Sequence, residues 1–412
     1  MWNGAATHTG DRSIRTVAAL GTAQTVAWAS SYYLPAVLAI PIAHDLGIPA
    51  RTVFAAFSVA LIASALIGPW AGQMIDRHGG RPVLIGTNLV FAGGLVILAL
   101  AQGTLTLFLA WFVLGAAMGS GLYEAAFSSL VYLYKSRARN VITGVTLIAG
   151  FASTVGWPLT TLLEAQFGWR GACLAWAALH CLLGIPLNAV LPRSLEHPGP
   201  QTRSSSKGPA ASDAPFEPAT SRPAFTAFLL ALVFAFTWFI STAMAAHLPR
   251  LVQSAGATLA VAVGVGALVG PAQVGGRLLE FGVLRHVHPL LSARLAALAH
   301  PAGVIALLLL GAPAAALFAI LHGAGNGILT IAKGTLPLVF FGAHGYGARQ
   351  GWMMMPARGA QALAPFLFGL AVDRWGAGAL WISGALGLAA FVALMLLPDP
   401  HRRARAAVVA ER

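Results

Sequence analysis

The amino-acid sequence predicts an all-α integral membrane protein with twelve transmembrane helices in two parallel six-helix repeats. Composition is the first reason, because 58% of the 412 residues are hydrophobic and only 9% are charged, whereas soluble domains carry about 25% charged residues. The second reason is a series of apolar runs, each long enough to cross a hydrocarbon core of ~30 Å. The third is that landmarks of the first half return in the second.

The expected helices are twelve apolar runs separated by glycine, proline and charged residues. The first run is too long, and starts too late, to be a removable signal peptide, and no small-residue cleavage site follows it. We therefore keep it as part of the fold. The runs fall near residues 16–42, 51–75, 82–102, 105–133, 140–163, 171–192, 224–248, 257–282, 290–311, 313–337, 350–371 and 379–397.

One interior segment, residues 193–223, is rich in proline, serine and charge and cannot form a packed core. This segment separates the first six apolar runs from the last six. We expect an N-terminal six-helix bundle at 1–192, a cytoplasmic linker at 193–223, a C-terminal bundle at 224–400 and a cytoplasmic tail at 401–412.

Matching landmarks relate the two halves. The segments GSGLYEAAF and GNGILTIAK occupy equivalent runs, and each lies within GxxxG spacing. All the offsets between matched positions lie between 202 and 208 residues, which is explained by two repeats of the same orientation. The matched positions are Gly115 and Gly119 with Gly323, Gly325 and Gly327, Gly68-Pro69 with Gly270-Pro271, and Pro158 with Pro365.

Basic residues predict the orientation of the chain. With both termini in the cytoplasm, the inner loops and tails hold most of the lysines and arginines, and the outer loops hold only Arg51, Arg170, Arg250 and Arg374. We therefore expect a multi-pass protein of the inner (cytoplasmic) cell membrane. The net charge of +13 does not indicate nucleic acid as a partner, because it is dispersed over short loops rather than gathered on one face. The lipid bilayer, with its anionic headgroups, is a sufficient partner.

Charge is concentrated in the turn after the second run, where residues 72–82 read GQMIDRHGGRP. This segment resembles the signature loop of the major facilitator superfamily. The resemblance implies a two-bundle transporter in which Gly72 permits close packing, Asp76 meets an opposite charge or a helix end, and Arg77 and Arg81 face the cytoplasm. The loop would then stabilise one access state. The alternative is a plain positive-inside loop that turns at Gly79. The second half carries AQVGGRLLE at the equivalent place and has no Asp-Arg pair.

A finer resemblance concerns the branch of the superfamily. The segment YLYKSRARNVITGVTLIAG resembles the entry to the fifth helix of the monocarboxylate porters. Arg277 and Arg358 match the arginine of the eighth helix and the basic residue of the eleventh in the monocarboxylate and oxalate/formate branches. The aspartate that often accompanies the first of these is missing. The resemblance implies a small anionic substrate. We expect the chain to function as a monomer, because one chain encloses a complete site.

Ionisable residues inside membrane spans are costly and mark functional sites. Arg277 is a candidate for binding a carboxylate, although it lies near the inner end, where it can also extend to the interface or pair with Glu280. Arg358 lies close to the midplane and is a second candidate, or an internal partner of Glu124. Glu124 itself has two interpretations, as a carrier of the coupling proton or as a permanent counter-ion for an arginine.

Uncharged residues supply weaker candidates. Trp28, Tyr32 and Tyr33 either line a cavity or belong to an interfacial aromatic belt. Gln273 and Asn326 either contact substrate or form hydrogen bonds between helices. We expect Lys333 to extend to the inner membrane surface.

These patterns together predict a secondary transporter that moves a small, monocarboxylate-like organic anion by alternating access, with proton coupling or anion exchange. The alternative is an efflux antiporter for a neutral or cationic compound. No catalytic motif or P-loop is present, so we expect neither an enzyme nor a cofactor. Cys173 and Cys181 suggest neither a disulfide framework nor a metal site.

Overall fold

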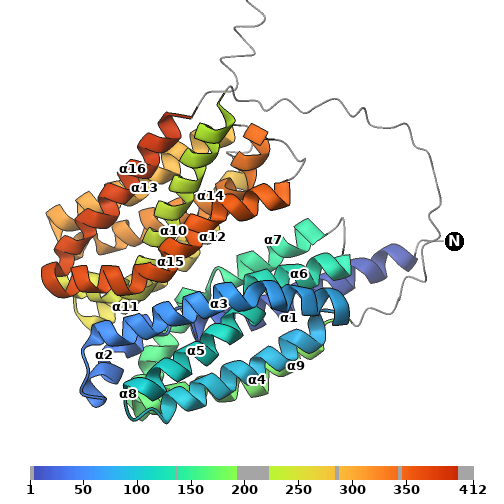
Figure 1. The fold of residues 1–412 in the computed structure, drawn as a ribbon, viewed down its shortest axis with the longest axis horizontal. Helices are drawn as coiled ribbons and strands as arrows, with labels where there is room; N and C mark the ends of the chain where they lie inside the picture. Colours follow the sequence, from blue (N-terminus) through green and yellow to red (C-terminus); the bar gives the residue numbers. More distant parts are fainter. Residues whose placement is uncertain (1–3, 135–137, 193–221, 284–286, 342–345, 398–412) are drawn as a thin grey trace, which may run out of the picture.

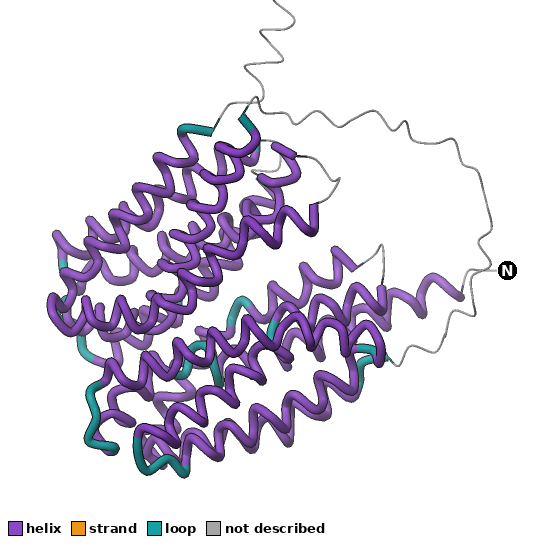
Figure 2. Tube along the Cα trace, viewed as in Figure 1, coloured by secondary structure: helices purple, strands orange, loops and turns teal. Residues whose placement is uncertain are grey.

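The computed structural model describes residues 4–134, 138–192, 222–283, 287–341 and 346–397. The described residues are almost entirely helical, and no strand occurs among them (Figure 2). The expected linker 193–223 and the tail 401–412 lie almost wholly outside this part of the chain.

The first half of the chain contains nine α-helices and one π-helical turn in its described part (Figure 1). They are α1 (Gly4–Ala29), α2 (Pro35–Asp45), α3 (Ala50–His78), α4 (Gly80–Ala99), α5 (Thr104–Gly121), α6 (Tyr123–Tyr134), α7 (Ala138–Ala149), α8 (Ala152–Leu179), the π-helix η2 (His180–Gly184) and α9 (Ile185–Ala189).

The second half contains seven α-helices and two short 3₁₀ turns in its described part. They are α10 (Pro223–Ser254), α11 (Leu259–Ala267), α12 (Val269–Gly282), α13 (Pro289–Leu310), η4 (Ala312–Ala314), α14 (Ala315–Phe341), α15 (Tyr346–Trp375), η5 (Gly376–Ala379) and α16 (Leu380–Met395).

The helix bounds are consistent with the twelve predicted spans. Nine helical stretches of the described chain are long and apolar enough to cross a membrane. Two of them, Val141–Ala189 with 49 residues and Met353–Met395 with 43, are each about two spans long. Gly168 (φ 67°) and Gly376 (φ 55°) turn the backbone within these two stretches. With the α1–α2 pair as a further span, the arrangement is consistent with twelve.

Four of the predicted spans are split rather than continuous. The helix is interrupted at residues 30–34 in the first span, at Leu122 in the fourth and at 150–151 in the fifth. In the eighth span α11 and α12 meet at Leu268, whose dihedral angles remain helical (φ −71°, ψ −20°). A broken helix exposes backbone polar groups, which a membrane protein tolerates only where they are buried in protein or line a water-filled space. The breaks therefore indicate that these spans border an internal cavity.

The helices gather in two bundles (Figure 1), α1 to α9 in blue to green and α10 to α16 in yellow-green to red. One large apolar core belongs mostly to the first bundle and includes Phe57, Trp111 and Trp176. A separate core lies wholly within the second bundle and includes Phe234 and Phe340.

The GxxxG pairs make equivalent contacts in the two bundles. A Cβ atom built on Gly119 of α5 would lie 2.5 Å from the Ser64 carbonyl oxygen of α3. A Cβ atom on Gly327 of α14 would lie 2.3 Å from the Gln273 carbonyl oxygen of α12. The fourth span thus packs on the second as the tenth packs on the eighth, as the internal repeat predicts.

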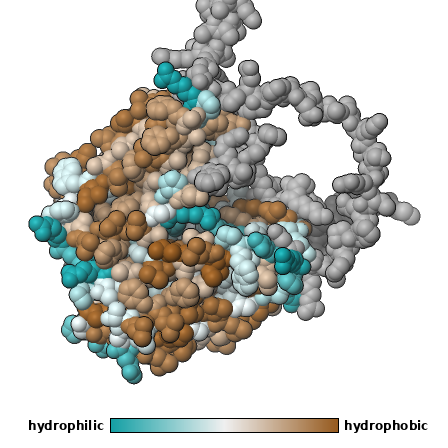
Figure 3. Space-filling model, viewed as in Figure 1, coloured by the Kyte–Doolittle hydropathy of each residue, from teal (hydrophilic) through white to brown (hydrophobic). Residues whose placement is uncertain are grey.

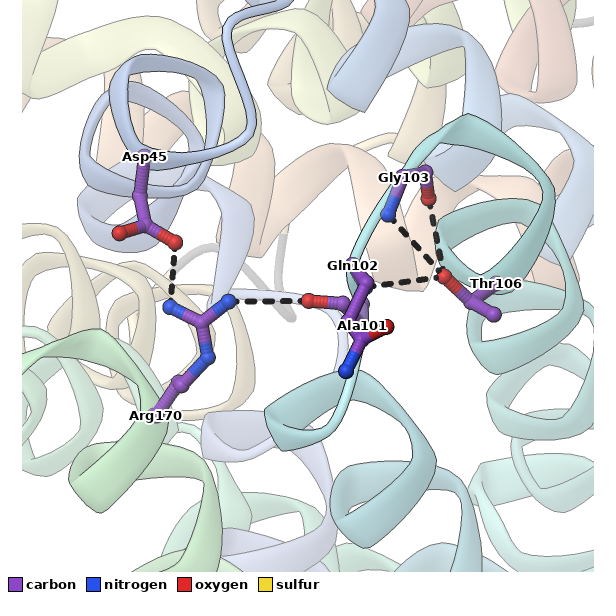
Figure 4. Close-up of polar contacts among 6 residues, drawn as sticks. All are labelled: Asp45, Ala101, Gln102, Gly103, Thr106 and Arg170. Carbon is purple, nitrogen blue, oxygen red and sulfur yellow. Dashed lines mark hydrogen bonds and ion pairs between the residues drawn. The ribbon is translucent and has the colours of Figure 1, made fainter.

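Polar contacts fasten three segments at one end of the first bundle (Figure 4). Arg170 of α8 forms an ion pair with Asp45, at the end of α2, and donates a hydrogen bond of 3.0 Å to the Ala101 carbonyl oxygen. Thr106 closes the same turn, because its hydroxyl oxygen accepts from the Gln102 and Gly103 amides at 3.2 and 3.3 Å. Arg51 and Arg170, two of the four outer-loop arginines of the predicted orientation, belong to this end of the first bundle.

Apolar side chains cover most of the exterior that Figure 3 shows in colour. Large apolar residues are widely exposed, including Leu105 (84%), Leu182 (77%) and Leu309 (75%). A soluble monomer does not expose apolar surface on this scale. The exterior is therefore suited to contact with lipid acyl chains.

Candidate functional site

A cavity of ≈ 460 Å³ lies between the two bundles. Its walls come from α1 and the break after it, α3, α5, α6 and α7 on one side, and from α10, α12, α14 and α15 on the other. This volume falls in the range of about 300–1,000 Å³ that is usual for small-molecule sites. All eight residues that the sequence nominated for binding or proton coupling line it, namely Trp28, Tyr32, Tyr33, Glu124, Gln273, Arg277, Asn326 and Arg358.

Positive charge predominates in this cavity. Among the described lining residues, Arg277, Lys333 and Arg358 are basic and only Glu124 is acidic. The three cations come from α12, α14 and α15, so they surround the space from the second bundle. Such an arrangement favours an anion, because Coulomb interactions are stronger in a cavity with apolar walls than in bulk water.

Arg358 pairs with Glu124 across the interface between the bundles. Its Nη2 donates to Glu124 Oε1 at 2.8 Å, and the two side chains are 42% and 63% exposed. The pair joins α15 to α6 and is open to the cavity. The structure thus contains the internal pair that the sequence offered as one interpretation of both residues.

Arg277 is held by the opposite bundle as well. Its Nη1 donates to the Thr146 carbonyl oxygen of α7 at 2.9 Å. Its Nε is buried and has no hydrogen-bond partner among the described residues. It does not pair with Glu280, whose Oε1 accepts from Ser292 at 3.2 Å instead. The guanidinium is therefore directed into the interface between the bundles rather than toward the membrane surface.

Lys333 was wrongly expected to extend to the inner surface. The residue is only 8% exposed, and its Nζ lies 4.4 Å from the centroid of the Trp238 ring, where a cation–π interaction is favourable. The sequence did hold a signal for this position, because Asn326, Thr330 and Lys333 fall on one face of α14 at spacings of four and three residues. All three line the cavity.

The aromatic residues of the first span form a connected wall of the cavity. Trp28 and Tyr32 have ring centroids 5.0 Å apart, and those of Tyr32 and Tyr33 are 5.5 Å apart. Trp28 also contacts Tyr123, a lining residue that sequence reasoning missed, at 4.8 Å. The Tyr32 hydroxyl lies 2.7 Å from Thr242 Oγ1 of α10. These rings therefore lie inside the protein and not in an interfacial belt.

The family model described as Major Facilitator Superfamily matches residues 20–355 of this chain. The match covers well over half of the chain. The chain belongs to the major facilitator superfamily. It is accordingly a multi-pass membrane transporter and not an enzyme.

Individual relatives match shorter parts of this superfamily member. Monocarboxylate transporter 3 of Rattus norvegicus is 33% identical over 28% of this chain and 24% of its own length. The multidrug resistance protein MdtL of Shigella flexneri is 36% identical over 43% of this chain and 42% of its own length. The chain thus spans less than half the length of the curated relatives that it matches.

Solved structures support the fold over nearly the whole chain. The D-xylose-proton symporter has a TM-score of 0.71 at 15% identity and covers 94% of this chain and 98% of its own. A point mutant of the nucleoside transporter NupG has a TM-score of 0.72 at 14% identity and covers 93% of this chain and 99% of its own. At such identities the likeness concerns the fold alone.

The superfamily's signature loop forms the turn from α3 to α4. Gly79 has φ 78°, and its amide donates to the Ile75 carbonyl oxygen at 2.8 Å, which ends α3. Arg77 is exposed, and Arg81 Nη1 lies 3.5 Å from the Leu191 carbonyl oxygen. The side chain of Asp76 lies outside the described residues.

The expected role of Gly72 is not seen in this conformation. A Cβ atom built there meets no described atom within 4 Å, so this glycine is not needed for close packing here. Gly80 takes that role, because its Cβ would lie 2.0 Å from Ser129 Oγ of α6. Close packing in this loop thus involves α4 and α6.

Proposed function

We propose that this transporter moves a small organic anion, such as a monocarboxylate, by alternating access. The observation that carries the proposal is the excess of basic side chains in the central cavity, three against one carboxylate. Guanidinium groups bind carboxylates through paired, charge-assisted hydrogen bonds. The printed name of the rat relative, a monocarboxylate transporter, supports the same substrate class.

The protein itself neutralises part of the positive charge in this cavity. Glu124 forms an ion pair with the Arg358 guanidinium, and Nη1 of Arg277 donates a hydrogen bond to the Thr146 carbonyl oxygen. A substrate carboxylate would compete with Glu124 for Arg358. Because Arg358–Glu124 and Arg277–Thr146 both join the bundles, substrate binding would replace contacts that hold the halves together on this side of the cavity. Anion binding would thereby change the equilibrium between access states.

The conformation fits an inward-open state if both termini are cytoplasmic. The bundles pack together at the end that holds Asp45, where Phe54 of α3 lies against His247 of α10 at 4.0 Å between ring centroids. The bundles diverge in Figure 1 toward the end that holds the start of α1. We propose the inner cell membrane as the location, 1–192 and 224–400 as the two bundles, and a monomer as the functional unit.

The test is thermal stabilisation of the purified protein by small carboxylates, sugars and lipophilic cations, since a ligand that binds only the native state raises its stability. We expect carboxylates to stabilise the wild-type protein. In Arg358→Ala the apparent affinity falls about 10- to 100-fold, the usual value of a hydrogen bond to a charged group. Arg51→Ala, an exposed arginine outside the cavity, is the matched control and leaves the affinity unchanged.

The role of Glu124 is tested by Glu124→Gln. If Glu124 is a counter-ion, removing it frees Arg358, and anion affinity rises a few-fold (about 1 kcal/mol or less). If Glu124 carries the coupling proton instead, the variant loses acid-driven uptake and keeps exchange of anion for anion. If carboxylates stabilised Arg358→Ala with the wild-type affinity, the proposal that Arg358 binds the anion would be refuted.

Export of a neutral or cationic compound is the second candidate function. It is favoured by the similarity to MdtL and by the wall formed by Trp28, Tyr32, Tyr33 and Tyr123. Stabilisation by lipophilic cations that is indifferent to Arg277→Ala and Arg358→Ala would select this function. The carboxylates in the same panel would then have no effect.

A further inference from the structure

Two histidines face each other inside the second bundle, outside the cavity described above. The Nδ1 atoms of His300, on α13, and His322, on α14, are 3.0 Å apart. The residues are only 6% and 4% exposed. Two ring nitrogens at this distance share a hydrogen bond only if one of them carries a proton and the other does not. The pair therefore holds one proton between its rings.

The outer nitrogen of His300 has no partner. Its Nε2 is buried and makes no hydrogen bond to any described residue. We assign the shared proton to His300 Nδ1, because Nε2 then presents a lone pair rather than a buried N–H without an acceptor. A second proton added at this lone pair makes His300 an imidazolium, whose Nδ1–H donates a charge-assisted hydrogen bond to His322. The new Nε2–H would then need a water in the small cavity beside His300 as its acceptor.

His180 of the first bundle shows the contrasting arrangement. Its Nδ1 lies 2.8 Å from Asn88 Oδ1, and its Nε2 lies 2.7 Å from Ser30 Oγ. Both ring nitrogens of His180 thus have hydrogen-bond partners in the neutral ring, unlike Nε2 of His300. His180 serves structure, whereas the His300–His322 pair has an unused site.

A route connects the pair to the central cavity. A small cavity of ≈ 20 Å³ is lined by His300, His322 and Asn326, and a second of ≈ 10 Å³ is lined by His322, Asn326, Gln273 and Tyr33. One water requires roughly 10–15 Å³ of such volume. Asn326, Gln273 and Tyr33 also line the central cavity. One or two waters in these cavities, held by hydrogen bonds to the Asn326 amide, would carry a proton between the central cavity and the histidines.

The surroundings of the pair are uncharged. No described lining residue of the cavity beside both histidines carries a formal charge. The described ionisable groups of α13 and α14 have contacts elsewhere: His288 with the Leu290 amide, Arg294 with the Leu394 carbonyl oxygen and Lys333 with Trp238. The same holds for the described groups of the helices packed around them, which are Glu280 with Ser292, Arg277 with Thr146, Arg358 with Glu124, Arg250 with Asp373 and His247 with the Pro365 carbonyl oxygen. Arg222 and Arg374 lie at helix ends. A proton on the pair is thus shared chiefly between its two rings.

We propose that the His300–His322 pair is a proton-binding site of this transporter, loaded through Asn326 from the central cavity. Its use in coupling rests on the proposed anion transport. A proton bound here adds positive charge beside an anion site, so proton and anion bind cooperatively. This arrangement couples the two without requiring Glu124 to change its charge.

Proton binding is tested without any transported compound. The full chain is labelled with ring ¹⁵N-histidine, placed in lipid nanodiscs and followed by NMR between about pH 5 and pH 8, where histidine charge changes are expected. The pair's signals are those lost in His300→Gln and in His322→Gln. We expect them to change to the doubly protonated form as pH falls, and each single variant to shift the titration of the remaining ring. The His180 signals, identified by His180→Gln, stay neutral.

Two NMR results would overturn the proposal: signals of the pair that stay neutral throughout, or two rings that titrate independently of each other. Coupling is then tested in proteoliposomes with labelled lactate and oxalate. We expect His300→Gln to lose uptake driven by an acidic exterior and to keep exchange of anion for anion. Loss of both activities, or retention of both, refutes the coupling role. If the wild-type protein moves neither probe while the pair titrates, the anion proposal fails and the proton site stands.

Discussion

At the scale of single residues, the three cations of the cavity differ in what holds them. Arg358 has a carboxylate partner and Arg277 a backbone carbonyl, both from the opposite bundle. Lys333 contacts the Trp238 ring of its own bundle. Removing an ammonium group from water costs stability, and Lys333 is only 8% exposed. Such a cost persists where the charge is used for binding. At Lys333, therefore, the positive charge that would bind the anion also lowers the stability of the folded protein.

Replacing Lys333 by methionine tests this opposition. Lys333→Met keeps a long apolar side chain on Trp238 but removes the charge, so we expect an unchanged or higher Tm for the empty protein. The affinity for carboxylates falls about 10-fold, because one charge-assisted contact is lost. Thermal unfolding with and without carboxylate measures both effects. Lys333→Arg is the control that keeps the charge, and a lower Tm together with unchanged affinity in Lys333→Met would make Lys333 purely structural.

At the scale of helices, glycines set how closely the spans approach. In α12 and α14 the contact is between backbones, because a Cβ on Gly327 would lie 2.3 Å from the Gln273 carbonyl oxygen and a Cβ on Gly276 would lie 2.5 Å from the Ala324 carbonyl oxygen. These helices carry Arg277 and Lys333. Their separation therefore determines the geometry of the proposed anion site.

Gly327→Ala forces this helix pair apart and should lower stability by about 1–3 kcal/mol, the usual cost of overpacking. Gly275→Ala is the matched control, since its Cβ meets no described atom within 4 Å. It should leave Tm unchanged or raise it slightly, because alanine favours helix more than glycine does. Thermal unfolding of the two variants in one detergent provides the comparison. Equal Tm values would show that α12 and α14 are not in close contact.

The sequence predicted spans and residue types better than it predicted contacts. Apolar length locates the helices, so the predicted run 290–311 matches α13 at 289–310. Arg277, Arg358 and Glu124 could be identified from the sequence, because each is a charged residue inside an apolar run. Placing a charge in a membrane span costs free energy, so such residues mark functional sites. Contacts between residues far apart in the chain leave no local pattern. The ring of Trp238 beside Lys333 and the meeting of His300 with His322 therefore emerged only from the structure.

At the scale of the whole molecule, the bundles meet mainly at one end. Gly369 of α15 lies in this contact, since its Cβ would lie 3.2 Å from His247 Cε1 and 3.5 Å from Phe54 Cδ2. Tyr32 adds a polar contact with Thr242 between the bundles. Alternating access requires these contacts to separate while the bundles approach each other at the opposite end. The closed end thus stabilises the present conformation in proportion to how well it packs.

Gly369→Trp should shift the molecule toward the opposite access state, because an indole cannot fit between Phe54 and His247. Spin labels at Arg51→Cys, on the exposed start of α3, and Arg374→Cys, on the exposed end of α15, measure this separation, with the exposed Cys181 first replaced by serine. We expect the distance distribution to gain a longer component.

Leu370→Trp is the control for this prediction. Leu370 is the next residue along α15 and is 38% exposed, so its replacement should leave the distance distribution unchanged. Because only one of two access states is destabilised, carboxylate binding persists in Gly369→Trp while the transport rate falls. An unaltered distance distribution together with normal transport would mean that Phe54, His247 and Gly369 do not form the closed end of the transport pathway.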